Sequence, residues 1–173
     1  MKIIIINGTS CSGKSSIIKK IMKDKDDLFH LNQDSLKWSF SKYSSEKHHG
    51  NVHKIILAVA DAVFKIKYDI ICDSGLYKEE KQNLIDLAKQ NNYEVIEINL
   101  EADFDILLNR FNERVESALN VPEKDRRISN LSVDRFKELF DIFNKNKNPL
   151  AITFRTDKET PEEIVEHLKK YFN

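Results

Sequence analysis

Residues 2–15 decide the fold, and they read Lys-Ile-Ile-Ile-Ile-Asn-Gly-Thr-Ser-Cys-Ser-Gly-Lys-Ser. The four consecutive isoleucines predict a strand covered on both faces of a sheet. From Lys14 onward the apolar residues recur at helical spacing, which predicts a helix over 14–23. Gly8–Ser15 matches the pattern G-x-x-x-x-G-K-[ST], and a strand before it and a helix after it are the context that this pattern requires.

The residue types of this loop suit the binding of phosphate groups. Glycines let the backbone turn tightly and approach oxygen atoms closely, while successive amides and a helix N-terminus offer partial positive charge. We expect Lys14 to reach the β- and γ-phosphates of ATP and Ser15 to ligate Mg²⁺. The expected ATP-binding residues are Gly8, Thr9, Ser10, Cys11, Ser12, Gly13, Lys14, Ser15 and Ser16. The competing interpretation is a glycine turn before an ordinary helix.

Beyond this unit, short β-branched runs alternate with amphipathic helices. The expected strands are 2–7, 28–33, 68–72, 93–99 and 150–155. The clearest later helices cover 52–65 and 104–115, and a C-terminal helix has a capping box at Thr160 and Glu163. Such alternation predicts parallel pairing in a three-layer α/β/α sandwich, with one domain over 1–173. Residues 116–131 lack periodicity, and we expect a lid at approximately 115–131.

The composition excludes several classes of protein. The chain has 173 residues, 28 basic and 28 acidic residues and 40% hydrophobic residues, so it is globular and has no net charge. A broad nucleic-acid footprint or a membrane-surface role would require a basic surplus, although a local basic groove remains compatible. The two cysteines, Cys11 and Cys72, favour a reduced cytoplasmic setting over a disulfide framework. The longest apolar stretch, 55–64, is far shorter than the roughly 20 residues of a membrane span.

Two aspartates follow predicted strands. In an open α/β sheet, ligands bind outside the carboxyl ends of the strands, where Asp34 and Asp73 are expected beside the phosphate loop. Asp73 is a candidate Mg²⁺ ligand, directly or through water, or a solvated residue that ends a strand. Asp34 is a candidate general base for an acceptor hydroxyl, or the cap of a helix that begins at Ser35.

Arginines precede and occupy the predicted lid. Arg110 and Arg114 are four residues apart and therefore share a helix face, from which guanidinium groups could neutralise charge during phosphoryl transfer. The alternative is a solvated face in which Arg114 pairs with Glu113 or Glu116. Arg126 and Arg127 lie in a mixed-charge run, either as lid residues or as solvated surface.

Basic and aromatic residues gather close to Asp34. They are Lys37, Trp38, Lys42, Tyr43, Lys47 and Lys54. Such a mixture could form an acceptor-binding groove that uses stacking and phosphate contacts. It could equally be a lysine-rich surface with Trp38 in the core.

These features together resemble the kinase domain of phage-type polynucleotide 5′-hydroxyl kinases. The resemblance rests on the phosphate loop, on Phe29-His-Leu-Asn-Gln-Asp34-Ser-Leu-Lys37, on Ile70-Ile-Cys-Asp73-Ser-Gly-Leu and on Leu108-Asn-Arg110-Phe-Asn-Glu-Arg114. The chain is also similar to chloramphenicol phosphotransferase-like enzymes through 34–36, and to zeta-toxin-type sugar-nucleotide kinases in general plan.

The resemblance implies a lidded P-loop kinase with strand order 2-3-1-4-5, ATP as phosphoryl donor and Mg²⁺. It implies that Asp34 is the base, that Lys37 contacts acceptor phosphate, and that Arg110 and Arg114 are the lid arginines. The acceptor would be a hydroxyl of a nucleic-acid end, a nucleotide or a small molecule, with no membrane and no obligate protein partner. Lys37 stands where the family has an arginine, which loses bidentate phosphate recognition.

Other nucleotide-binding classes fit the sequence less well. A regulatory GTPase would need Asn-Lys-x-Asp, but Asn144-Lys-Asn-Lys147 ends in lysine. An ATPase motor usually has Glu after the second-motif Asp, whereas Ser74 follows Asp73. A non-catalytic nucleotide-binding module would not require Asp34 or the arginines.

Overall fold

The computed structural model describes residues 1–74, 78–119 and 132–171. The strands are β1 (Lys2–Asn7), β2 (Leu28–Asn32), β3 (Asp69–Ser74), β4 (Glu94–Glu101) and β5 (Ile152–Arg155). The helices are α1 (Lys14–Lys23), α2 (Gln33–Trp38), α3 (Ser45–Ile66), α4 (Lys78–Gln90), α5 (Phe104–Leu119), α6 (Val133–Asn146) and α7 (Pro161–Lys169).

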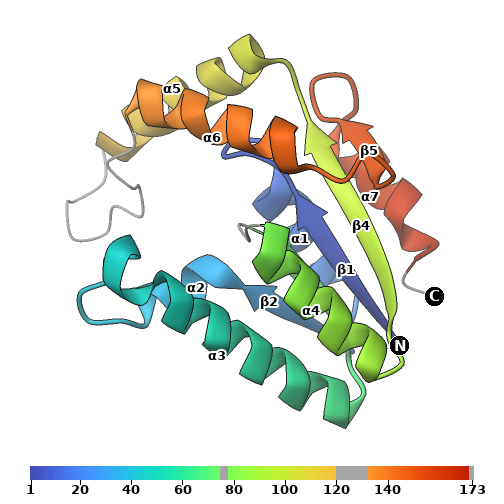
Figure 1. The fold of residues 1–173 in the computed structure, drawn as a ribbon. Helices are drawn as coiled ribbons and strands as arrows, with labels where there is room; N and C mark the ends of the chain where they lie inside the picture. The colour runs from blue at the N-terminus through green and yellow to red at the C-terminus, as the bar shows by residue number, and fades with distance from the viewer. Residues whose placement is uncertain (75–77, 120–131, 172–173) are drawn as a thin grey trace.

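The strands form one five-stranded parallel sheet with the order β2-β3-β1-β4-β5. Helices α3 and α4 cover one face of this sheet and α1 and α7 cover the other (Figure 1). The three-layer α/β/α sandwich and its strand order are therefore confirmed. In such a sheet the carboxyl ends of all strands point to the same edge, which is where ligands bind.

The isoleucines of β1 serve both layers. Ile3 and Ile5 pack with α3 and α4, whereas Ile4 and Ile6 pack with α1 and α7, because successive strand residues point to opposite faces. All four are at most 1% exposed. A third cluster joins α5 to α6 through Phe111 and Phe136 and packs against Cys11 of the phosphate loop. The α5–α6 pair is thereby held next to the loop.

Several boundaries differ from the sequence prediction: β2, β3 and β4 are shifted by one or two residues at their ends, and three further differences concern α3, β5 and α5. Helix α3 begins at Ser45 instead of residue 52, because Ser44 accepts a hydrogen bond from the Lys47 amide as N-cap and Gly50 is tolerated inside the helix. Strand β5 begins at Ile152, and Leu150 is 92% exposed. Helix α5 continues to Leu119, so the predicted irregular segment begins later than residue 116. Residues 120–131, with Arg126 and Arg127, lie outside the described residues, and the lid stays a prediction.

The C-terminal helix has the predicted capping box. The Thr160 hydroxyl accepts from the Glu163 amide, and the Glu163 carboxylate accepts from the Thr160 amide. Of the helices in the described part of the chain, none has the length and apolar character needed to cross a membrane.

Candidate functional site

The shape of the phosphate loop depends on its two glycines. A Cβ on Gly8 would lie 2.9 Å from the carbonyl oxygen of Leu100 in the neighbouring strand β4. Gly13 has a φ of 88°, which is the left-handed region that favours glycine. Side chains at these positions would therefore distort the loop. The sequence motif has glycine at both of these positions, as the structure requires.

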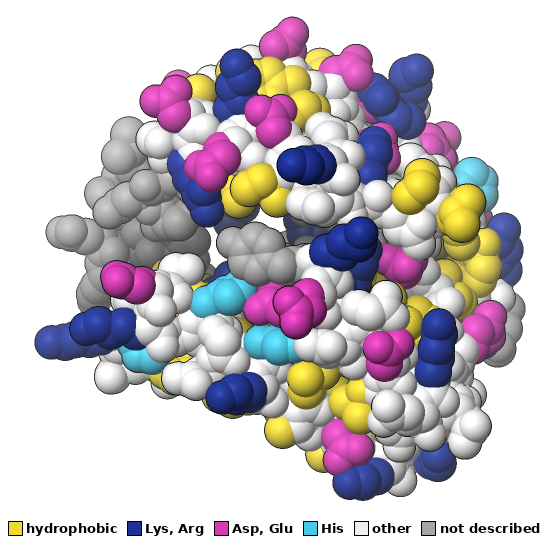
Figure 2. Space-filling view, in the orientation of Figure 1, with side chains coloured by type: hydrophobic (Ala, Val, Ile, Leu, Met, Phe, Trp, Pro, Cys, Tyr) yellow, Lys and Arg dark blue, Asp and Glu magenta, His cyan; other side chains and the backbone are white. Residues whose placement is uncertain are grey.

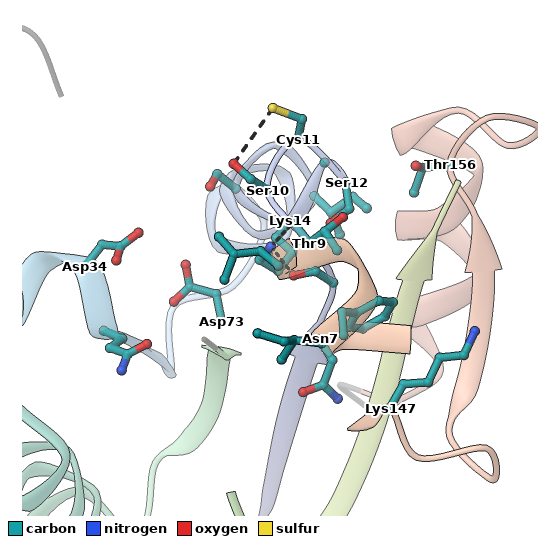
Figure 3. Close-up of a pocket in the computed structure, with 18 of the residues that line it drawn as sticks. Asn7, Thr9, Ser10, Cys11, Ser12, Lys14, Asp34, Asp73, Lys147 and Thr156 are labelled. Atoms are coloured by element: carbon teal, nitrogen blue, oxygen red, sulfur yellow. Dashed lines mark hydrogen bonds between the residues drawn. The ribbon is translucent and has the colours of Figure 1, made fainter. Parts of the chain in front are cut away.

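The ammonium group of Lys14 lies within this loop. Its Nζ donates hydrogen bonds to the carbonyl oxygens of Gly8 and Thr9, both at 2.7 Å. Burial lowers the pKa of Lys14 to about 8, and the carboxylates of Asp73 and Asp34 partly oppose this shift. Figure 3 shows both aspartates on the same side of Lys14, Asp34 from α2 and Asp73 from the end of β3. Two carboxylates thus lie close enough to Lys14 for their charge to affect its pKa.

A cavity of about 940 Å³ opens beside the loop, and its size is that of a ligand-binding site. Figure 2 shows the surface hollowed between α3 and the α5–α6 pair, with Lys and Arg side chains on parts of the rim and His, Asp and Glu side chains on the lower edge. The basic side chains that line the cavity are Lys14, Lys37, Lys78, Lys81, Arg110, Arg114, Arg135 and Lys147. The acidic ones are Asp34, Asp73 and Glu159. In a chain of zero net charge, this local surplus attracts polyanions such as a triphosphate.

One amide side chain connects the two aspartate-bearing elements. Asn32 lies opposite Asp73 in the β2–β3 register, and its Nδ2 donates to Asp73 Oδ2 at 2.7 Å. Its Oδ1 accepts from the Ser35 amide at 2.6 Å and caps α2. The cap of α2 is therefore Asn32, and the alternative interpretation of Asp34 as the cap is wrong. Asn32 was not among the residues predicted from the sequence, although an Asn three residues before Ser35 is a recognised N-cap pattern.

Asp34 lies in the first turn of α2 and remains accessible. Its side chain is 71% exposed, and Oδ1 is 2.9 Å from the Nζ of Lys37. Both residues line the cavity. In this structure Lys37 contacts Asp34, so an acceptor phosphate would have to compete for the same ammonium group.

The two arginines of α5 also line the cavity. Arg110 donates from Nη1 to the Thr156 hydroxyl at 3.0 Å and from Nη2 to the Thr156 carbonyl at 2.6 Å. Arg110 thereby ties α5 to the segment between β5 and α7. Arg114 is exposed. The shared face predicted from their spacing thus opens onto the phosphate loop.

The basic and aromatic group near Asp34 only partly reaches the cavity. Lys37 and Tyr43 line it, and Tyr43 packs against His48 at 5.9 Å between ring centroids. Trp38 is 62% exposed, so the interpretation that places it in the core is wrong. The sequence also gave no signal for Lys78, Lys81, Arg135 and Lys147, which reach the cavity from α4, α6 and the segment after α6.

Solved structures share this fold at low sequence identity. The APS kinase of Mycobacterium tuberculosis, solved with AMPPNP and APS, is 13% identical with a TM-score of 0.65, over 99% of this chain and 96% of that chain. A sugar kinase from Janibacter sp. is 14% identical with a TM-score of 0.64, over 99% and 94%. A chain of the Pnkp1/Rnl/Hen1 RNA repair complex is 15% identical with a TM-score of 0.66, over 84% of this chain but 44% of that longer chain.

These likenesses identify the fold as that of P-loop kinases, whose loop binds a nucleotide. Structures of such low identity show the fold alone, whereas a family is recognised from the residues themselves. The family model described as Zeta toxin matches residues 2–160, which include the phosphate loop, both aspartates and both α5 arginines. The chain therefore belongs to the Zeta toxin family.

Proposed function

We propose that this chain is an ATP-dependent phosphotransferase that moves the γ-phosphoryl group of ATP to an acceptor hydroxyl. The observation that supports it most is that the phosphate loop, Asp34 and the α5 arginines line one cavity. A phosphate loop alone would serve an ATPase or a binding module. An accessible carboxylate beside the loop additionally suits the activation of an incoming hydroxyl.

The proposed reaction is a direct displacement at the γ-phosphorus. The backbone amides of the loop and Lys14 hold the triphosphate, and Lys14 exchanges its contacts with Gly8 and Thr9 for phosphate oxygens. The acceptor oxygen forms a bond to the γ-phosphorus while the bond to the β–γ bridging oxygen breaks, which releases ADP. Asp34 takes the hydroxyl proton, and Arg110 and Arg114 neutralise the charge that develops on the transferring group.

The residues fit a Mg²⁺ ion that is bound mainly through the nucleotide. Mg²⁺ is usually held by one or two carboxylates together with substrate phosphates, and the described residues contain no group of three metal-ligating side chains. Asp73 is suited to this role because Asn32 fixes Oδ2, while Oδ1 is buried without a hydrogen bond from the described residues, 3.3 Å from His30 Nε2. Ser15 and Asp73 would hold the ion, which would screen the phosphate charge.

Two acceptor classes compete. A polynucleotide or nucleotide 5′-hydroxyl is supported by the exposed Trp38 and the lysines near Asp34, which suit bases and phosphates. A small-molecule acceptor, such as a sugar nucleotide or an antibiotic, is supported by the family match, because the zeta-toxin resemblance implied sugar-nucleotide kinases.

The test is incubation with γ-labelled ATP, Mg²⁺ and a panel of hydroxyl compounds. The panel contains a 5′-hydroxyl oligonucleotide, adenosine, UDP-glucose and chloramphenicol, and the products are separated by chromatography. We expect label on one class of acceptor. ATP binding without label on any compound would favour a nucleotide-binding module. Release of inorganic phosphate at a rate that no compound changes would favour a hydrolase.

Asn32 provides a prediction about positioning. Asn32→Ala removes both the cap of α2 and the hydrogen bond to Asp73, and turnover should fall by about tenfold or more, the usual effect of losing a partner of a metal-binding carboxylate. Asn32→Ser keeps a capping hydroxyl without the reach to Asp73, so it should recover thermal stability but not turnover. Steady-state kinetics and thermal melts of both variants provide the measurement. Full turnover in the Ser variant would show that the bond to Asp73 is dispensable.

A further inference from the structure

We infer that the Asn7 amide, with Asn99 buried beside it in the sheet, forms an acceptor subsite that recognises an uncharged polar group on a ring, such as a hydroxyl or an amide. The inference rests on the proposed function, since it concerns the acceptor of that reaction. It starts from two polar side chains that the phosphate-binding chemistry does not use.

The two amides are neighbours in the sheet and are incompletely bonded. Asn7 and Asn99 are partners in the β1–β4 register, so their side chains project from the same face. Asn7 is 7% exposed and Asn99 is 1% exposed. Among the described residues, Asn7 Nδ2 and Asn99 Oδ1 have no hydrogen-bond partner. A donor and an acceptor thus lie side by side, and leaving such buried groups unbonded is costly.

The charged side chains around these amides compensate one another. Lys81 Nζ lies 2.8 Å from Glu97 Oε2, and Lys147 Nζ lies 2.8 Å from Glu101 Oε1. Asn148 donates to Glu97 Oε1 at 2.7 Å. These pairs leave little net charge in this part of the cavity. The group that fits here is therefore polar and uncharged, in contrast to the phosphates at the loop.

The position of Asn7 assigns its amide to the acceptor. Asn7 follows Ile3 and Ile5 in the alternation of β1, so it faces the α3–α4 side, whereas the phosphate loop continues into α1 on the opposite face. Asn7 lines the cavity together with Ile142 and Phe143 of α6, which supply an apolar wall. Asn99 lies beside Asn7 in the sheet and is not one of the cavity-lining residues. Figure 3 shows the Asn7 amide directed away from the phosphate loop, on the side of Lys147. A ring with one apolar face and a polar edge suits this part of the cavity, between Asn7 and the apolar wall of α6.

The test compares Asn7→Leu with the wild type and with Asn144→Leu. Asn144 is an exposed α6 residue outside the cavity whose amide bonds its own helix, so this control makes the same substitution elsewhere. Thermal midpoints are measured without ligand, and KM and kcat are measured with the panel compound that the wild type phosphorylates. In Asn7→Leu we expect an unchanged or higher midpoint, an acceptor KM raised at least about tenfold and an unchanged KM for ATP, because only acceptor hydrogen bonds are lost.

Two results would overturn the subsite. If the thermal midpoint of Asn7→Leu falls by about 3 °C or more, the two amides bond each other in solution, because the substitution then leaves the Asn99 amide without its partner. An unchanged acceptor KM would mean that the Asn7 amide does not touch the acceptor. If the wild type phosphorylates no compound, the proposed function fails independently of the subsite. The subsite is then tested by the change in thermal midpoint that the same compounds cause in the presence of AMPPNP. A shift that Asn7→Leu abolishes supports the subsite, and no shift of the wild type refutes it.

Discussion

Asp34→Asn should lower turnover by at least about 10²-fold while the affinity for ATP survives. The substitution keeps the size of the side chain and its place in the first turn of α2, but an amide cannot take the proton of an attacking hydroxyl. Helix α2 should persist, because its cap is Asn32. The side chain is 71% exposed, so little packing is lost. The effect is therefore expected on kcat.

The matched control for this change is Asp141→Asn, which alters an exposed aspartate of α6 that does not line the cavity. Initial rates with saturating acceptor and the affinity for a fluorescent ATP analogue are compared for the wild type, Asp34→Asn and Asp141→Asn. Near-normal turnover of Asp34→Asn would remove Asp34 from the mechanism. A loss of ATP binding in that variant would instead assign Asp34 to the donor site.

Lys14→Ala should abolish transfer to below detection. In the structure Lys14 Nζ has two carbonyl partners within the loop, and these are contacts that a triphosphate can replace. No other ammonium group of the described residues lies in the same loop. Without Lys14, the β- and γ-phosphates lose the charge that holds them in line with the acceptor.

The control for Lys14 is Lys147→Ala in the transfer assay, which removes a cavity lysine on the far side from Asp34 (Figure 3). Lys147→Ala should retain far more activity than Lys14→Ala, even if acceptor binding weakens. Thermal melts show whether each variant is folded. Transfer by folded Lys14→Ala within about tenfold of the wild-type rate would contradict the proposed role, because a central charge-stabilising group is normally worth more than this.

The layers and the parallel pairing could be predicted from the sequence because the signals for each element are local, whereas the strand order was implied by the family resemblance. Four isoleucines, two glycines at required positions and a capping box at Thr160 each specify their own element, and parallel pairing follows from the alternation. Asp34 and Asp73 could be brought together from sequence alone, since Asp34 comes shortly after β2 and Asp73 lies at the end of the neighbouring strand β3, at the same edge of the sheet.

The remaining features depend on contacts between distant segments. Arg110 meets Thr156 across 46 positions, and Asn32 meets Asp73 across 41. Asn7 ends the run of isoleucines and Asn99 lies between Ile98 and Leu100, and nothing in the local pattern indicates that their amides are neighbours. The early start of α3 was hidden by Gly50, because glycine weakens a helix signal without preventing the helix.

The destination of the γ-phosphate tests the central claim most directly. In a single turnover with γ-labelled ATP, Mg²⁺ and excess acceptor from the panel, the account predicts one label on the acceptor for each ADP formed, and a rate that depends on acceptor concentration. Label that appears as inorganic phosphate, at a rate unaffected by any acceptor, would contradict phosphoryl transfer to a hydroxyl group.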